Sequence, residues 1–99
     1  MINMVEELRR LVSIRSEVTV RDGEIVRRGY GEAARAVREL AERAGLDAEV
    51  VEVEAPGGPV PVVSIRVRGA GPTLALVSHY DVVPAAGPWV VEGREVDPY

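Results

Sequence analysis

The sequence predicts an α/β fold in which two helices are followed by three strands. Apolar residues recur at helical spacing in two segments of the first half, over about residues 3–14 and 31–44. From residue 48 onward the pattern changes to Val-rich segments that are separated by turns rich in Gly and Pro. A chain of 99 residues forms one domain or part of a larger one, so these elements belong to a single unit, 1–99.

The first helix is predicted over about residues 3–14. Asn3 is suited to cap this helix, and Glu6, three residues later, completes a capping-box pattern. The apolar stripe of the helix consists of Met4, Val5, Leu8, Leu11 and Val12. This stripe is expected to pack on the rest of the domain.

The second helix, over about residues 31–44, is the most clearly patterned element. Small apolar residues dominate its buried face, and Gly45 provides a left-handed stop. The segment between the helices, 16–29, is ambiguous. It contains an Asp-Gly turn signal at 22–23 and is compatible with a short hairpin.

Three strands are predicted over about residues 48–54, 61–68 and 73–78. The first two alternate apolar and polar residues, which suits a strand with one face partly in water. The third, Thr-Leu-Ala-Leu-Val-Ser, is apolar on both faces and is typical of a central strand with a neighbour on each edge. The tail, 84–99, contains three prolines and two glycines and is predicted to be loop, with a short strand at 89–92.

Composition excludes several classes of function. The net charge of −4 argues against nucleic-acid binding, which requires clustered basic residues. There is no cysteine and no lysine, which excludes disulfides, thiolate zinc sites, cysteine nucleophiles and lysine-dependent phosphate loops. No apolar run approaches the ~20 residues that span a bilayer. The first residues are too charged for a secretory signal, so no membrane association and a cytoplasmic location are expected.

Candidate functional residues follow the apolar segment 73–78. His79 is the only histidine of the chain, and Asp81 lies two residues later. Ligands of open α/β sheets bind at the carboxyl ends of strands. A metal-bound histidine usually donates its second ring N–H to a carboxylate or a carbonyl. The spacing is compatible with a metal ligand and its orienting carboxylate, although a surface histidine beside an ordinary turn aspartate is commoner on spacing alone.

The order of motifs resembles the di-zinc peptidase and deacylase family. That family includes aminoacylase, acetylornithine deacetylase, succinyl-diaminopimelate desuccinylase, glutamate carboxypeptidase and carnosine dipeptidase. Residues 78–84, Ser-His-Tyr-Asp-Val-Val-Pro, are similar to its first metal motif, and residues 11–16 are similar to its Leu-Val-x-Ile-x-Ser segment. Trp89 and residues 97–99 resemble the Trp…Asp-Pro-Phe segment that follows the metal motif. The resemblance covers essentially the whole chain and implies the amino-terminal part of a mixed-sheet zinc-peptidase catalytic domain.

The resemblance implies zinc-dependent hydrolysis of an amide or peptide bond, of the deacylase or dipeptidase/carboxypeptidase type. His79 would bind one of two zinc ions, with cobalt or manganese as alternative metals. Asp81 would be the catalytic-site carboxylate that orients the His79 ring. The substrate of the full-length protein would be a small N-acyl amino acid or a peptide.

The remaining motifs of that family are absent from residues 1–99. They are a Gly-Arg-Gly-x-x-Asp segment, whose Asp bridges the metals, and a Glu-Glu pair that holds the general base. The chain alone is therefore expected to be inactive. It is also expected either to self-associate or to depend on a missing carboxy-terminal segment.

Two other functions stay open. The first is a stand-alone small α/β protein with a partner-binding or structural role and no catalysis. The second, a dinucleotide-binding fragment, is indicated by Gly-Tyr-Gly-Glu-Ala-Ala at 29–34, with Glu52 or Glu54 roughly twenty residues on. This second function requires a buried strand before the first glycine, and segment 24–28 is too short and too charged for that role.

Overall fold

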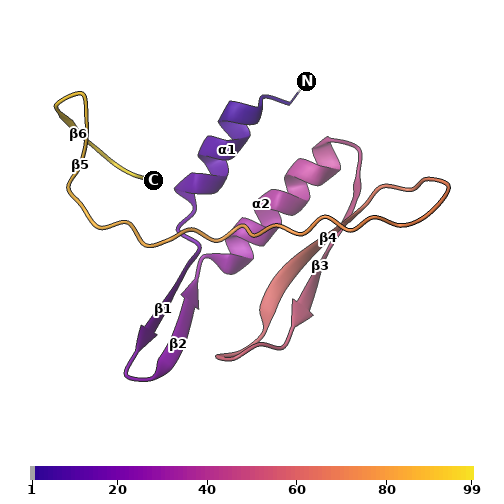
Figure 1. Cartoon of the computed structure of the whole chain (residues 1–99), viewed down its shortest axis with the longest axis horizontal. Helices are drawn as coiled ribbons and strands as arrows, with labels where there is room; N and C mark the ends of the chain where they lie inside the picture. The colour runs from indigo at the N-terminus through magenta and orange to yellow at the C-terminus, as the bar shows by residue number, and fades with distance from the viewer. Residues whose placement is uncertain (1) are drawn as a thin grey trace.

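The structure is a computed structural model that describes residues 2–99 (Figure 1). The elements in chain order are α1 (Met4–Ser13), β1 (Glu17–Arg21), β2 (Glu24–Arg28), α2 (Tyr30–Arg43), β3 (Asp47–Val53), β4 (Val60–Arg66), β5 (Trp89–Val91) and β6 (Arg94–Val96). Over residues 2–99 the strands form three two-stranded antiparallel sheets, β1–β2, β3–β4 and β5–β6. The mixed α/β class is confirmed, whereas the expected mixed sheet is not formed by these residues.

Both helices begin where local chemistry favours a start. The Asn3 side chain accepts hydrogen bonds from the amides of Val5 and Glu6 and so caps α1. Gly29 precedes α2 with a φ of 74°, a left-handed conformation that glycine adopts without steric cost. A Cβ at Gly29 would lie 2.5 Å from the carbonyl oxygen of Arg15. This glycine therefore allows α2 to start directly against the turn that follows α1.

Alanines give α2 a small buried surface, and two of them, Ala33 and Ala36, cluster with Ile14. Its buried residues are Ala33, Ala34, Ala36 and Ala41. The helix contacts both strands of the hairpin, whose register places Val50 opposite Val63. These two strands correspond to the segments predicted at 48–54 and 61–68. Local pairing and a small-residue helix face therefore account for this part of the fold.

The ambiguous segment 16–29 forms the β1–β2 hairpin, in which Val20 pairs with Ile25. Asp22 and Gly23 have φ values of 52° and 78°, so both turn residues are left-handed. Two left-handed residues are the signature of the two-residue turn that matches the twist of an antiparallel hairpin. The Asp-Gly signal thus acts as a hairpin turn.

The segment 73–78 differs from the sequence prediction because it belongs to no sheet of the described chain. Leu74, Leu76 and Val77 are 82%, 90% and 95% exposed. A central strand requires hydrogen-bonding neighbours on both edges and covering layers on both faces. Residues 2–99 supply neither, so the segment runs as an irregular trace (orange in Figure 1).

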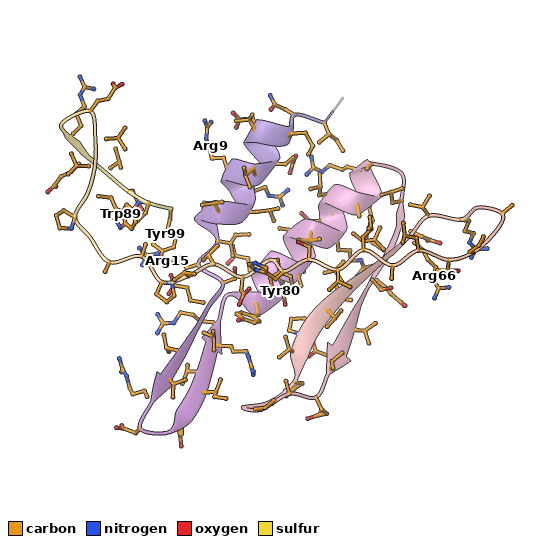
Figure 2. All side chains as sticks on the ribbon, viewed as in Figure 1. Arg9, Arg15, Arg66, Tyr80, Trp89 and Tyr99 are labelled. Atoms are coloured by element: carbon orange, nitrogen blue, oxygen red, sulfur yellow. The ribbon has the colours of Figure 1, made fainter. Side chains whose placement is uncertain are left out.

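The tail also differs from the loop that was predicted. A short strand appears at the expected place, as β5, and it pairs with β6, which the sequence analysis did not predict. Tyr99 attaches the end of the chain to the start of β1. Its ring lies under the Arg15 guanidinium, 4.0 Å from the ring centroid, and its hydroxyl donates to Glu17 (Figure 2).

The chain is more extended than a compact domain of its length. Its radius of gyration is 16.3 Å, whereas compact domains of this length have about 13 Å. Its accessible surface is 8130 Å², against roughly 5,500 Å² for a compact protein of its mass. No helix among residues 2–99 combines the length and the apolar character needed to cross a bilayer.

Candidate functional site

Residues 76–82 form one wall of a cavity of about 480 Å³. The other walls are apolar side chains of α1, α2 and β4, namely Leu8, Leu11, Val12, Val37, Val63 and Ile65. His79 and Asp81 both lie on the 76–82 wall. The two predicted site residues therefore border an open cavity and are not part of the packed interior.

His79 and Asp81 are in direct contact, as their spacing indicated. The Nδ1 atom of His79 lies 2.9 Å from Oδ1 of Asp81, and 3.2 Å from the backbone oxygen of the same residue. An ionised carboxylate only accepts hydrogen bonds, so Nδ1 carries the proton in this contact. The His79 side chain is 84% exposed. Its Nε2 makes no hydrogen bond within residues 2–99 and is left with a lone pair that a metal ion can use.

The second carboxylate oxygen of Asp81 is bound by a tyrosine that the sequence analysis did not single out. The hydroxyl of Tyr30, the first residue of α2, donates to Oδ2 of Asp81 over 2.8 Å. Burial first, and the bond to Asp81 second, raise the pKa of Tyr30 to about 12. The phenol is therefore a stable donor at neutral pH. No spacing in the sequence signals this contact, because 51 positions separate the two residues.

Ser16 holds the backbone on both sides of Asp81. This serine is fully buried, and its hydroxyl donates to the carbonyl of Tyr80 over 3.2 Å. Its own carbonyl accepts the amide of Val82 over 2.8 Å. The short turn after α1 thus fixes residues 80–82, although the chain on either side of them forms no strand.

Tyr80 connects this segment to the helices and to β4 (Figure 2). Its hydroxyl donates to the carbonyl of Pro61 over 2.5 Å, and its ring packs against the buried cluster that includes Ile14 and Ala36. Its ring also meets the ring of Tyr30 edge-to-face, with 5.6 Å between centroids and 80° between planes. Burial, followed by the charge of Asp81, raises the pKa of Tyr80. Both phenols beside Asp81 therefore stay protonated at neutral pH.

These residues provide one suitable metal ligand, but they do not form a complete metal site. His79 offers a free ring nitrogen and a carboxylate that orients the ring, which is the environment of a metal-bound histidine. Within residues 2–99, no group of three or more His, Cys, Asp or Glu side chains is placed to hold a metal ion. No hydrolytic step can therefore be assigned to these residues by themselves.

The dinucleotide-binding interpretation is not favoured by the geometry. It requires a central parallel strand immediately before Gly29. The strand at that place is β2, which, within residues 2–99, pairs with β1 alone, in an antiparallel hairpin. Gly29 instead serves the close approach of α2 to Arg15.

Comparison of the chain with models of protein families, with curated proteins and with solved structures gives no match.

Proposed function

We propose that this chain contributes one metal ligand, His79, to a zinc-dependent amide or peptide hydrolase of the deacylase or dipeptidase type. The observation that supports the proposal is the 2.9 Å contact that holds Nδ1 of an exposed histidine on a carboxylate at the edge of a cavity. When bound in such enzymes, zinc activates a water molecule and polarises the carbonyl group. This chain's part is to present Nε2 of His79 and to hold the ring in place through Asp81.

The chain by itself is inactive in this proposal, because one imidazole binds zinc weakly. A structural site with four ligands contributes about 10–16 kcal/mol. One ligand then contributes roughly a quarter of that free energy, about 2.5–4 kcal/mol, which corresponds to a dissociation constant of about 1–15 mM. The remaining ligands, and the general base that hydrolyses an N-acyl amino acid or peptide, would come from polypeptide outside residues 1–99.

Zinc titration tests the ligand assignment, followed by NMR of the His79 ring and, in His79→Gln, of the backbone amides of the chain. We expect millimolar binding at Nε2, loss of that binding in His79→Gln, and about tenfold weaker binding in Asp81→Asn, since carboxylates that orient a ligand typically contribute 10- to 100-fold. Asp97→Asn removes one carboxylate elsewhere and is the matched control. Zinc binding that is unchanged in Asp81→Asn would contradict the role of Asp81, and micromolar binding retained in His79→Gln would place the metal elsewhere.

The coding sequence next to codon 99 tests the wider proposal. We expect a continuation, or a neighbouring reading frame, that encodes Gly-Arg-Gly-x-x-Asp and a Glu-Glu pair. The joined polypeptide should release amino acids from N-acyl amino acids or dipeptides, and His79→Gln should abolish this activity. A joined polypeptide that hydrolyses these substrates equally well without His79 would overturn the proposal.

A second candidate function, association with another polypeptide without catalysis, is favoured by the exposed segment 73–78. The backbone of this segment makes no hydrogen bond within residues 2–99, and residues 69–78 carry no charged side chain. The chain exposes roughly 2,600 Å² more surface than a compact protein of its mass. Covering this excess in two copies would bury about 5,200 Å² in total, at the upper end of the about 2,000–5,000 Å² of obligate interfaces. We propose a second copy of the chain as the occupant, because two uncharged identical strands can pair without repulsion.

Sedimentation velocity over a range of protein concentrations tests this association. We expect the chain to be a dimer or larger at micromolar concentration and Leu76→Arg to be shifted toward monomer. Val90→Arg places the same charge on an exposed residue of β5 and is the control. A chain that stays monomeric at high concentration, or a Leu76→Arg variant that associates like the Val90→Arg variant, would contradict the pairing.

A further inference from the structure

We propose that Tyr30 is a positioning residue that acts through Asp81 to fix the tautomer of His79. Asp81 connects the two side chains, because Oδ2 accepts from the Tyr30 hydroxyl over 2.8 Å and Oδ1 accepts from Nδ1 of His79 over 2.9 Å. The inference rests on the proposed role of His79 as a metal ligand and extends that site to the first turn of α2.

The carboxylate of Asp81 needs a second donor if it is to orient the ring. Ser16 fixes the backbone on both sides of Asp81, but these bonds leave its two side-chain torsions free. A bond at Oδ1 alone permits the carboxylate plane to turn, and a donor at Oδ2 removes that freedom. Tyr30 is the donor that the structure places there.

Tyr30 is itself held from two sides. Gly29 lets the start of α2 approach the carbonyl of Arg15, which sets the position of the Tyr30 backbone. The edge-to-face contact with Tyr80 sets the ring, and Tyr80 is fixed by its bond to the Pro61 carbonyl. The phenol is thus placed by contacts that do not involve His79. It can impose an orientation on Asp81 instead of following it.

The consequence for His79 is a defined tautomer. A carboxylate locked at Oδ1 keeps the proton on Nδ1 and leaves the lone pair on Nε2. That is the form in which an exposed Nε2 can bind a cation without first moving a proton. Loss of the Tyr30 hydroxyl should allow the carboxylate to turn. The Asp81 backbone oxygen, 3.2 Å from Nδ1, is then the acceptor that remains, and the share of the Nε2–H tautomer should rise.

Nitrogen-15 NMR of the His79 ring in the metal-free chain, at about pH 8 where a free histidine is neutral, tests the inference. We expect the Nδ1–H tautomer to predominate in the natural chain and to fall severalfold relative to Nε2–H in Tyr30→Phe. Tyr99→Phe removes a phenol hydroxyl that donates to Glu17 and should leave the tautomer ratio unchanged. An unchanged ratio in Tyr30→Phe would overturn the proposal.

The natural chain alone provides a second readout, in case Tyr30→Phe does not fold. Predominance of Nε2–H in that chain would overturn the inference without any variant. The tautomer is measured without zinc, so its result is separate from that of the zinc titration. A tautomer that depends on Tyr30 in a chain that does not bind zinc through His79 would support the positioning role and contradict the metal role.

Discussion

Strand β4 and the segment 73–78 are similarly apolar, yet only one of them becomes a strand. β4 has β3 immediately before it in the chain, and α2 covers the hairpin. The segment 73–78 has no pairing partner among residues 2–99, and Leu76 and Val77 are almost fully exposed. The difference teaches that β character in this chain is decided by the availability of a partner and not by composition.

The largest expected effect on stability comes from a substitution where α2 lies closest to the turn after α1. Gly29→Val places a Cβ 2.5 Å from the Arg15 carbonyl at a φ of 74°. We expect a loss of about 3 kcal/mol or more in the free energy of unfolding, since a strained backbone alone costs about 1–3 kcal/mol. Urea unfolding followed by circular dichroism measures the loss.

Gly31→Ala is the matched control for that substitution. Gly31 is the second residue of α2, and a Cβ there meets no atom within 4 Å. We expect a small gain in stability, below the about 0.5–1 kcal/mol that alanine gives over glycine in the middle of a helix. A Gly29→Val chain as stable as Gly31→Ala would contradict the close approach of α2 to the turn at 15–16.

An effect of intermediate size is expected when one substitution is made in the packed helix α2 and another in the exposed segment 73–78. Ala33→Leu enlarges a side chain of α2 at a residue that is 1% exposed, and this overpacking should cost about 1–3 kcal/mol. Leu76→Ser changes a side chain that is 90% exposed and should stay within about 0.5 kcal/mol of the natural chain. Both are measured by urea unfolding in solutions dilute enough to keep the chain monomeric. Equal losses in the two variants would show that 73–78 is packed.

The smallest expected effect is a change in how the free energy of unfolding depends on pH above about pH 10. Burial and the bond to Asp81 raise the pKa of Tyr30 to about 12, from 10.0. The phenol ionises first in the unfolded chain, so its contribution to stability is complete below about pH 10 and is lost as the pH rises toward 12. The free energy of unfolding should fall over this range, and the fall should be shallower in Tyr30→Phe. Identical slopes in the two chains would contradict the Tyr30–Asp81 bond.

Features that depend on neighbours in sequence were predictable. The Asn3 cap of α1, the buried alanines of α2 and the Asp-Gly turn all act over a few residues, and the structure contains each of them. Only the Asn3 half of the predicted capping box forms, because the Glu6 side chain pairs with Arg9. The contact between His79 and Asp81 belongs to the same group, because the two residues are only two positions apart.

Features that depend on distant partners were not predictable. The Tyr30 bond to Asp81 spans 51 positions, and the Ser16 bond to Tyr80 spans 64. No periodicity in the sequence encodes either contact. The prediction of a strand at 73–78 was wrong for residues 2–99 for the same reason, since its apolar pattern specifies burial but not the neighbour that provides it.

The two hydrogen bonds of buried Ser16 hold residues 80–82 in place independently of what the segment 73–78 contacts. They hold the chain at residues 80–82, and β4 holds it at Arg66. Residues 67–79 can therefore change their contacts while both ends of this stretch stay in place. If a second copy pairs with 73–78 as proposed, the Ser16 bonds would keep Asp81 in contact with His79 during that pairing. Self-association and the proposed role of His79 as a ligand would then not disturb each other.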